Sequence, residues 1–154
     1  MLRDAQTVMA EDGFEFVFGL APDVPLPTVI ARLERSRAAT MTAPGRVPST
    51  FLLAEVEGEI VGRTSIRHRL NDGLFGFGGH IGYGVLPPFR RRGHATEILR
   101  QSLVIARSVG VDRALVSCDE DNEASARTIE RCGGVRDPDR VAGQPDHIRR
   151  YWID

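Results

Sequence analysis

The chain is organised around residues 79–99, Gly79-His-Ile-Gly-Tyr-Gly-Val85-Leu-Pro-Pro-Phe-Arg-Arg-Arg-Gly93-His-Ala-Thr-Glu-Ile-Leu99. An apolar run with period-2 character ends at Val85, and the proline pair that follows is incompatible with a helix interior or a central strand. A helical pattern of apolar residues begins after Gly93. The stretch therefore predicts a strand that leads through a short turn into the start of a helix.

This turn has the composition of an anion-binding site. Gly93 permits backbone conformations that a Cβ would block, and the small Ala95 keeps the first helical turn open. Backbone N–H groups of the turn lie beside the unpaired donors of the helix start, where the helix dipole favours negative charge. Arg90, Arg91 and Arg92 add guanidinium groups, which pair well with phosphate. We therefore expect a phosphate-bearing ligand, with a solvated basic turn or a nucleic-acid contact as the alternatives.

The pattern Arg90-x-x-Gly93-x-Ala95 resembles the Gln/Arg-x-x-Gly-x-Gly/Ala signature of the GNAT acetyltransferases, whose loop binds the pyrophosphate of acetyl-coenzyme A (acetyl-CoA). Val85-Leu86-Pro87 precedes it, as at the end of the fourth strand of that family. The resemblance implies a mixed α/β (α+β) GNAT-like acyl-CoA N-acyltransferase fold. Its central sheet would be mostly antiparallel, with flanking helices and with parallel, splayed strands at residues 79–85 and 114–118.

A second block, residues 114–134, follows at the usual distance of the family. It resembles the fifth strand, an Asn-x-x-Ser turn at Asn122 and Ser125, and a short helix closed by a glycine pair. The resemblance covers about residues 50–154 of a single domain, 1–154, in which residues 1–48 match weakly and the first strand of the family is not placed.

The resemblance also implies the residues that would bind acetyl-CoA. Backbone groups of residues 83–86 would contact the pantetheine arm, and the amides after Arg90 would bind the pyrophosphate. Asn122 and Ser125 would contact the far side, although the same pair would also suit a helix cap. The predicted cofactor-binding set is Val85, Leu86, Arg90, Arg91, Arg92, Gly93, His94, Ala95, Thr96, Asn122 and Ser125.

The catalytic residues depart from the family. Many GNAT enzymes carry a general-acid Tyr seven residues after the Asn, where this chain has Ile129. We predict Tyr83 as the acid and His80 as the base, with a core aromatic, a buried hydrogen-bonded histidine and a water chain as the alternatives. Their odd separation places them on opposite faces of a regular strand, unless a bulge at Gly82 or Gly84 changes that parity.

Composition limits the other classes of function. The 154 residues suit one domain, and the net charge of −1 calls for neither nucleic acid nor an anionic membrane. The sequence has no lysine, and codon bias explains its arginines better than selection for guanidinium chemistry does. Cys118 and Cys132 are too far apart for a Cys-x-x-Cys motif, and no His cluster completes a metal site. With no leader and no membrane-length apolar run, a cytoplasmic location is expected.

Local patterns predict the remaining elements. Residues 1–14 suggest a short helix that ends at Gly13, and 14–18 a brief strand or an aromatic lid. Thr28 would cap a helix to about Ala39, before a loop over 40–48 that would border the acceptor site. The other expectations are a hairpin over 50–68, a flexible connection over 71–79, a helix from 94 to 110, and strands near 135–136 and 147–153.

Together these features predict an N-acetyltransferase. A primary amine of a small molecule or peptide would attack the thioester of acetyl-CoA directly, giving an amide and free CoA. The alternative is a catalytically inactive acyl-CoA-binding or sensor module. An NTP-binding protein is disfavoured because the Gly-Lys-Ser/Thr of a P-loop is missing. The acceptor is not specified by these patterns, and a homodimer through an edge or terminal strand is left open.

Overall fold

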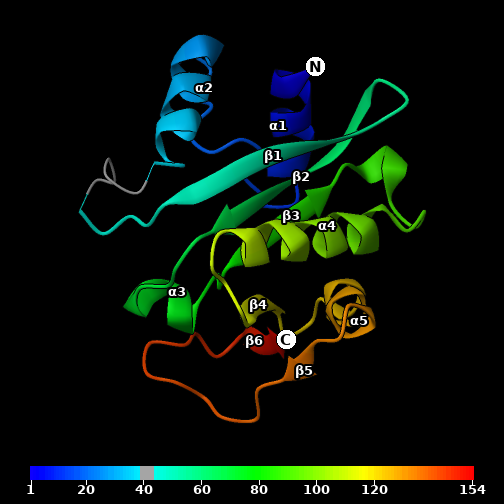
Figure 1. Ribbon diagram of the computed structural model, residues 1–154. Coiled ribbons are helices and arrows are strands. Elements are labelled where there is room, and N and C mark those ends of the chain that lie inside the picture. Colours follow the sequence, from blue (N-terminus) through cyan, green and yellow to red (C-terminus); the bar gives the residue numbers. More distant parts are fainter. Residues whose placement is uncertain (39–43) are drawn as a thin grey trace.

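The computed structural model describes residues 1–38 and 44–154 (Figure 1). The elements along the chain are α1 (Leu2–Ala10), α2 (Leu26–Arg35), β1 (Ser49–Val56), β2 (Glu59–Arg67), α3 (Asp72–Gly76), β3 (Ile81–Val85), a 3-10 turn η1 (Pro87–Phe89), α4 (His94–Ser108), β4 (Ala114–Asp119), α5 (Glu123–Arg131), β5 (Val135–Arg136) and β6 (Ile148–Ile153).

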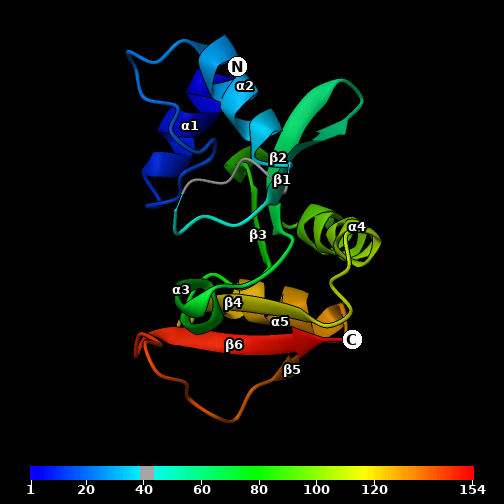
Figure 2. The ribbon, with the colours of Figure 1, turned by 60° about the vertical axis from the view of Figure 1, so that its left-hand side comes forward.

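The strands form two antiparallel sheets, in the orders β1-β2-β3 and β4-β6-β5. The predicted mixed α/β fold with antiparallel strands and flanking helices is confirmed. β3 and β4 belong to different sheets, and an isolated bridge joins Gly79, just before β3, to Val116 of β4. Figure 2 shows β3 running steeply away from the second sheet beyond this junction. The strands are thus splayed, while their parallel course stays a prediction.

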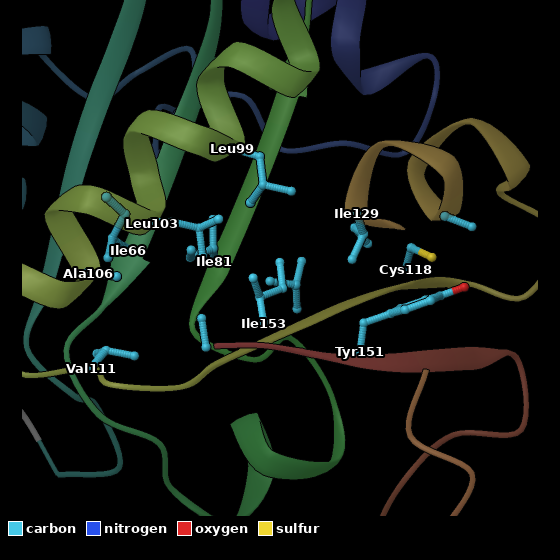
Figure 3. Close-up of a cluster of buried hydrophobic side chains, with 13 residues drawn as sticks. Ile66, Ile81, Leu99, Leu103, Ala106, Val111, Cys118, Ile129, Tyr151 and Ile153 are labelled. Carbon is cyan, nitrogen blue, oxygen red and sulfur yellow. The ribbon is translucent and has the colours of Figure 1, made fainter. Parts of the chain in front are cut away.

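The main core lies between the two sheets, α4 and α5 (Figure 3). Apolar residues at helical spacing on α4, among them Leu99 and Leu103, pack against Ile66 of β2 and Ile81 of β3. Within this core the buried Ser102 hydroxyl donates to Thr64 Oγ1 at 2.9 Å, so α4 is held in register on β2. The predicted helix after Gly93 is confirmed, because the apolar stripe and the sheet face it covers match.

A second core lies on the opposite face of the first sheet, under α1 and α2 (Figure 2). Here the prediction of a strand at residues 14–18 is wrong, since Phe16 is fully buried and the segment forms no ladder, while the alternative of an aromatic lid stays a prediction. The reason lies in Arg63 of β2. Its guanidinium donates hydrogen bonds to the carbonyls of Glu15 at 2.7 Å and Phe16 at 3.1 Å. A side chain thus satisfies the backbone that a strand would have satisfied.

Two other expectations need correction. α2 begins at Leu26 behind Pro25 rather than at a Thr28 cap, and it ends at Arg35; a prolongation to Ala39 would reach residues 39–43, which lie outside the described residues. The connection over 71–79 contains α3, because the Asn71 side chain accepts a hydrogen bond from the Leu74 N–H at 2.9 Å and starts a helical turn.

The beginning of the chain is helical rather than extended. Residues 1–38 and 44–48 contain no strand, so the first strand of the GNAT pattern is absent from the part of the chain described before β1. Across the described ranges, none of the helices combines the length and the apolar character needed to cross a bilayer.

Candidate active site

The free edge of β3 presents unpaired backbone groups where β3 and β4 diverge. At its two ends, His80 C=O accepts from Arg67 N–H at 2.7 Å, and Leu86 N–H donates to Val61 C=O at 2.9 Å, so the even-numbered residues face β2. Because pairing in an antiparallel ladder alternates, the N–H and C=O groups of the odd-numbered residues point to the other edge. These residues are Ile81, Tyr83 and Val85.

The turn between β3 and α4 presents a row of amide groups. Arg91 and Gly93 both have positive φ, 65° and 84°, and this turns the chain back on itself before the helix. The first N–H of α4 to reach a carbonyl is that of Glu97, which donates to Gly93 at 3.2 Å. The six preceding amides, residues 91–96, have no acceptor among the described residues. Free amides at a helix N-terminus form an oxyanion-binding site that the helix dipole reinforces.

The three arginines of this turn do not act together. Arg90 is held on the α1 side, because it donates to the Val85 carbonyl at 3.0 Å and pairs with Asp12 at 2.6 Å. Arg91 and Arg92 are exposed, and neither has a carboxylate partner among the described residues. The Arg90 side chain, which was predicted to contact phosphate, is therefore bound to other groups of the protein. The side chains of Arg91 and Arg92 stay available to an anionic ligand.

Asn122 and Ser125 lie at the start of α5, on the other side of the space between the splayed strands β3 and β4. The Asn122 side chain caps the helix by accepting from the Ser125 N–H at 3.0 Å, as the capping alternative predicts. The Ser125 hydroxyl in turn lies 3.0 Å from the Tyr83 hydroxyl. The structure thus brings two predicted site residues, Tyr83 and Ser125, into contact where the two sheets separate.

The Tyr83 phenol is protonated at neutral pH. Burial raises its pKa to about 12, against a smaller opposing effect of the hydrogen bond with Ser125. A phenol with this pKa keeps its proton across the physiological range. It therefore has the protonation state that a general acid requires.

This raised pKa predicts a loss of stability at high pH. The folded protein holds the Tyr83 proton up to about pH 12, whereas the unfolded chain releases it near 10. The free energy of unfolding therefore falls as the pH rises between these two values, and the stabilising effect is complete below pH 10. Urea unfolding of wild type and Tyr83→Phe from pH 8 upwards would measure it, since the variant should lose this part of the pH dependence. Equal pH dependence in both proteins would contradict the raised pKa.

His80 has the contacts of a structural histidine. Its ring is buried, and the ring Nδ1 accepts a hydrogen bond from the Leu115 N–H at 2.8 Å. The backbone N–H of His80 donates to the Leu115 carbonyl at 2.7 Å. Burial and, second, the charge of Arg67 lower its pKa. The accepting nitrogen is thus occupied, and protonation there would break the junction between β3 and β4. The geometry favours the buried, hydrogen-bonded histidine over the predicted base.

Three further expectations concern the parity of β3, the position of Ile129 and metal binding. The β2–β3 register is continuous from Gly62–Val85 to Ile66–Ile81, so no bulge changes the parity of the strand. Ile129, at the family's usual Tyr position, is fully buried in the main core (Figure 3). Among the described residues, no group of three or more His, Cys, Asp or Glu is placed to hold a metal ion.

Sequence reasoning missed a pocket of about 500 Å³ on the α1 and α2 side of the first sheet. The alternation of polar residues along β2 was the available signal, because Arg63, Ser65 and Arg67 share one face of a largely buried strand. Part of the segment expected to border the acceptor site does line this pocket, at residues 45–47, while residues 39–43 lie outside the described ones.

Comparison with known proteins places this geometry in context. The sequence profile described as "Acetyltransferase (GNAT) family" matches residues 23–134. The protein named acetyltransferase plu1384 from Photorhabdus laumondii is 33% identical over 155 residues, which span 96% of this chain and 95% of that protein.

Two solved structures show the same fold. One is the GNAT domain of S. lividans PAT, with a TM-score of 0.62 and 19% identity, covering 97% of this chain and 80% of that chain. The other is yncA of Salmonella typhimurium, solved with its cofactor acetyl-CoA, with a TM-score of 0.60 and 17% identity, covering 98% of this chain and 87% of that chain.

Proposed function

Because the chain belongs to the GNAT acetyltransferase family, we propose that it transfers the acetyl group of acetyl-CoA to a primary amine of a small molecule or peptide. The observation that carries this proposal is the row of unpaired amides at residues 91–96, which lies directly after the splayed strand β3.

The residues present fit the cosubstrate. Amides 91–96 would hold its pyrophosphate, with the exposed Arg91 and Arg92 adding positive charge. The free backbone edge of β3 around Tyr83 would pair with the amide groups of the pantetheine arm, as one more strand would. When bound, acetyl-CoA supplies an activated thioester, and the chain has to orient it and supply a proton.

Two observations support Tyr83 as the source of that proton: its hydroxyl lies at Ser125, where the sheets separate, and burial keeps it protonated. The amine nitrogen would bond to the thioester carbonyl carbon, the carbon–sulfur bond would break, and the Tyr83 hydroxyl would donate its proton to the departing sulfur. Solvent would then return a proton to the phenolate. Water, rather than His80, would take the proton of the amine, because Leu115 occupies the His80 nitrogen that would accept it.

Thermal unfolding with and without acetyl-CoA tests cosubstrate binding. At about a hundred times its Kd, acetyl-CoA should stabilise the wild type by roughly 2.7 kcal/mol, which raises the Tm by about 5–10 °C for a protein of this size. The double variant Arg92→Ala, Gly93→Asp should lose most of this shift, because a carboxylate would then lie among the phosphate-binding amides. Arg100→Ala, an exposed change further along α4, is the matched control and should keep the shift. Equal shifts in all three proteins would contradict the site.

A second function, acyl-CoA binding without turnover, is favoured by one observation. The position where many relatives carry a general-acid Tyr is the fully buried Ile129. Release of free thiol from acetyl-CoA in the presence of an amine separates the two functions. A thermal shift without thiol release for any amine would leave the binding module as the better description.

A further inference from the structure

The pocket beside the first sheet is lined by four arginines from three separate segments. Arg32 and Arg35 come from α2, Arg46 precedes β1, and Arg67 ends β2. Neutral hydrogen-bonding side chains complete the polar lining, and the volume of about 500 Å³ suits a small molecule. These neutral residues are Ser36, Ser49, Ser65 and Asn71.

The arginines of the pocket lack counter-charges. The lining contains no Asp or Glu, and none of the four guanidinium groups lies within 4.0 Å of a described carboxylate. Residues 39–43, Ala-Thr-Met-Thr-Ala, contain no acidic residue either. Two buried arginines elsewhere in the chain do have acidic partners, Arg150 with Asp137 at 2.8 Å and Arg149 with Glu123. High arginine content therefore does not explain this cluster.

Holding the charge of the largely buried Arg67 without a counter-ion is unfavourable. Burial lowers the pKa of Arg67, and burial together with the charge of Arg67 lowers the pKa of the neighbouring Arg63 to about 10. Arg63 is compensated by three backbone carbonyls and by the rings of Phe14 and Phe18, at 4.2 and 4.8 Å. In the pocket, Arg32 donates to the Phe18 carbonyl and Arg67 to those of Gly78 and Gly79, but neither pairs with a described carboxylate. A bound anion would supply the missing counter-charge.

The pocket adjoins the place where the strands separate. Arg67 donates to the carbonyls of Gly78 at 3.2 Å and Gly79 at 3.3 Å, next to the bridge to β4. Ser65 pairs with Gly82 of β3, and a Cβ added at Gly82 would lie 3.6 Å from Arg67 Nη1. The face of β3 at Gly82 therefore looks onto the pocket wall. A molecule bound there would lie next to β3, on the opposite face of the strand from the Tyr83 side chain.

Building on the proposed acetyl transfer, we propose that the acceptor is a small amine that also carries an anionic group, which the pocket arginines bind. Guanidinium groups pair with carboxylate and phosphonate oxygens alike, so amino acids and aminoalkylphosphonates share the required chemistry. Polyamines lack it and would be repelled by the same arginines. Charge complementarity thus narrows the acceptor from primary amines in general to amino-acid-like amines.

Matched acceptors test this inference. Thiol release from acetyl-CoA would be measured with the twenty common L-amino acids, each beside its carboxamide, and with 2-aminoethylphosphonate and spermidine. The acid of at least one pair should have a kcat/KM about ten- to a hundredfold above its amide, the range expected for charged hydrogen bonds. The phosphonate distinguishes the two anion types. Equal rates for every acid and amide pair, or a preference for spermidine, would overturn the inference.

Variants then connect the preference to the pocket. The double variant Arg35→Gln, Arg46→Gln removes two exposed guanidiniums of the lining and should reduce the acid-to-amide ratio by about ten- to a hundredfold, mainly through KM. Arg37→Gln, two residues beyond Arg35 and outside the lining, is the matched control and should keep the ratio. An unchanged ratio in the double variant would overturn the role of the pocket.

Binding alone separates failure of this inference from failure of the proposed function. If no amine releases thiol, the transfer reaction fails, and stabilisation by the same amines in thermal unfolding still reports on the pocket. Stabilisation by the acids but not by their amides, lost in Arg35→Gln, Arg46→Gln, would support anion recognition without catalysis. Absence of stabilisation by every acid and by the phosphonate would overturn the inference, whatever acetyl-CoA does.

Discussion

Gly79→Ala is expected to destabilise the protein by about 2–4 kcal/mol. A Cβ at this position would lie 2.3 Å from the Leu115 carbonyl oxygen and 2.9 Å from its carbon, both of which are backbone atoms of β4. The residue also has φ +62°, which adds a conformational cost for any residue with a Cβ. The positive φ contributes about 1 kcal/mol of this loss, and the clash with the Leu115 backbone contributes about 1–3 kcal/mol. The Tm should fall by about 5–15 °C, measured by calorimetry or by circular dichroism.

Gly110→Ala isolates the contribution of the clash. Gly110 also has a positive φ, +93°, but a Cβ there would have nothing within 4 Å. Its substitution should cost only the conformational part, about 1 kcal/mol. Similar losses for the two variants would show that the junction of β3 with β4 is looser than the structure indicates.

Tyr83→Phe is expected to lower kcat about a hundredfold while leaving acetyl-CoA binding unchanged. The variant keeps the aromatic ring that packs against the main core and removes the hydroxyl that lies 3.0 Å from Ser125. Loss of a positioned general acid typically slows a reaction by 10²–10⁴-fold, roughly 3–5 kcal/mol at the transition state. Steady-state thiol release would give kcat, and the Tm shift with acetyl-CoA would report on binding.

The matched control is Tyr151→Phe, a change to the other tyrosine of the chain. Tyr151 is buried, and its hydroxyl donates to Glu130 at 3.4 Å, away from β3. Its removal should leave kcat within about twofold, since no proposed step of acetyl transfer uses it. If Tyr83→Phe retains full turnover, Tyr83 has no part in the mechanism, and the proton of the sulfur comes from solvent.

Local sequence predicted the elements that carry the cofactor site. The prolines after Val85, Gly93 and the apolar period of α4 each act within a few residues, so the order of strand, turn and helix could be predicted without the rest of the chain. The same holds for Asn122, whose side chain caps a helix three residues away. The amide row of residues 91–96 follows from this local geometry.

Local reasoning reaches its limit where distant residues engage the same groups. Residues 14–18 have aromatic and apolar side chains typical of a strand, yet Arg63 takes their carbonyls from 47 or more positions away. Arg90 belongs to the predicted phosphate loop, but Asp12 and the Val85 carbonyl engage its guanidinium. The His80 ring likewise accepts a hydrogen bond from the N–H of Leu115, which lies on a strand of the other sheet.

The amino-acid sequence alone was enough to predict a turn that joins a strand to a helix, because proline, glycine and hydrophobic period act through steric limits on neighbouring residues. Tertiary packing was needed to bring Arg32, Arg46 and Arg67 around one pocket and Tyr83 against Ser125. These contacts join residues from separate helices and strands. Their geometry depends on how the two sheets and their helices pack, and no local pattern in the chain specifies that packing.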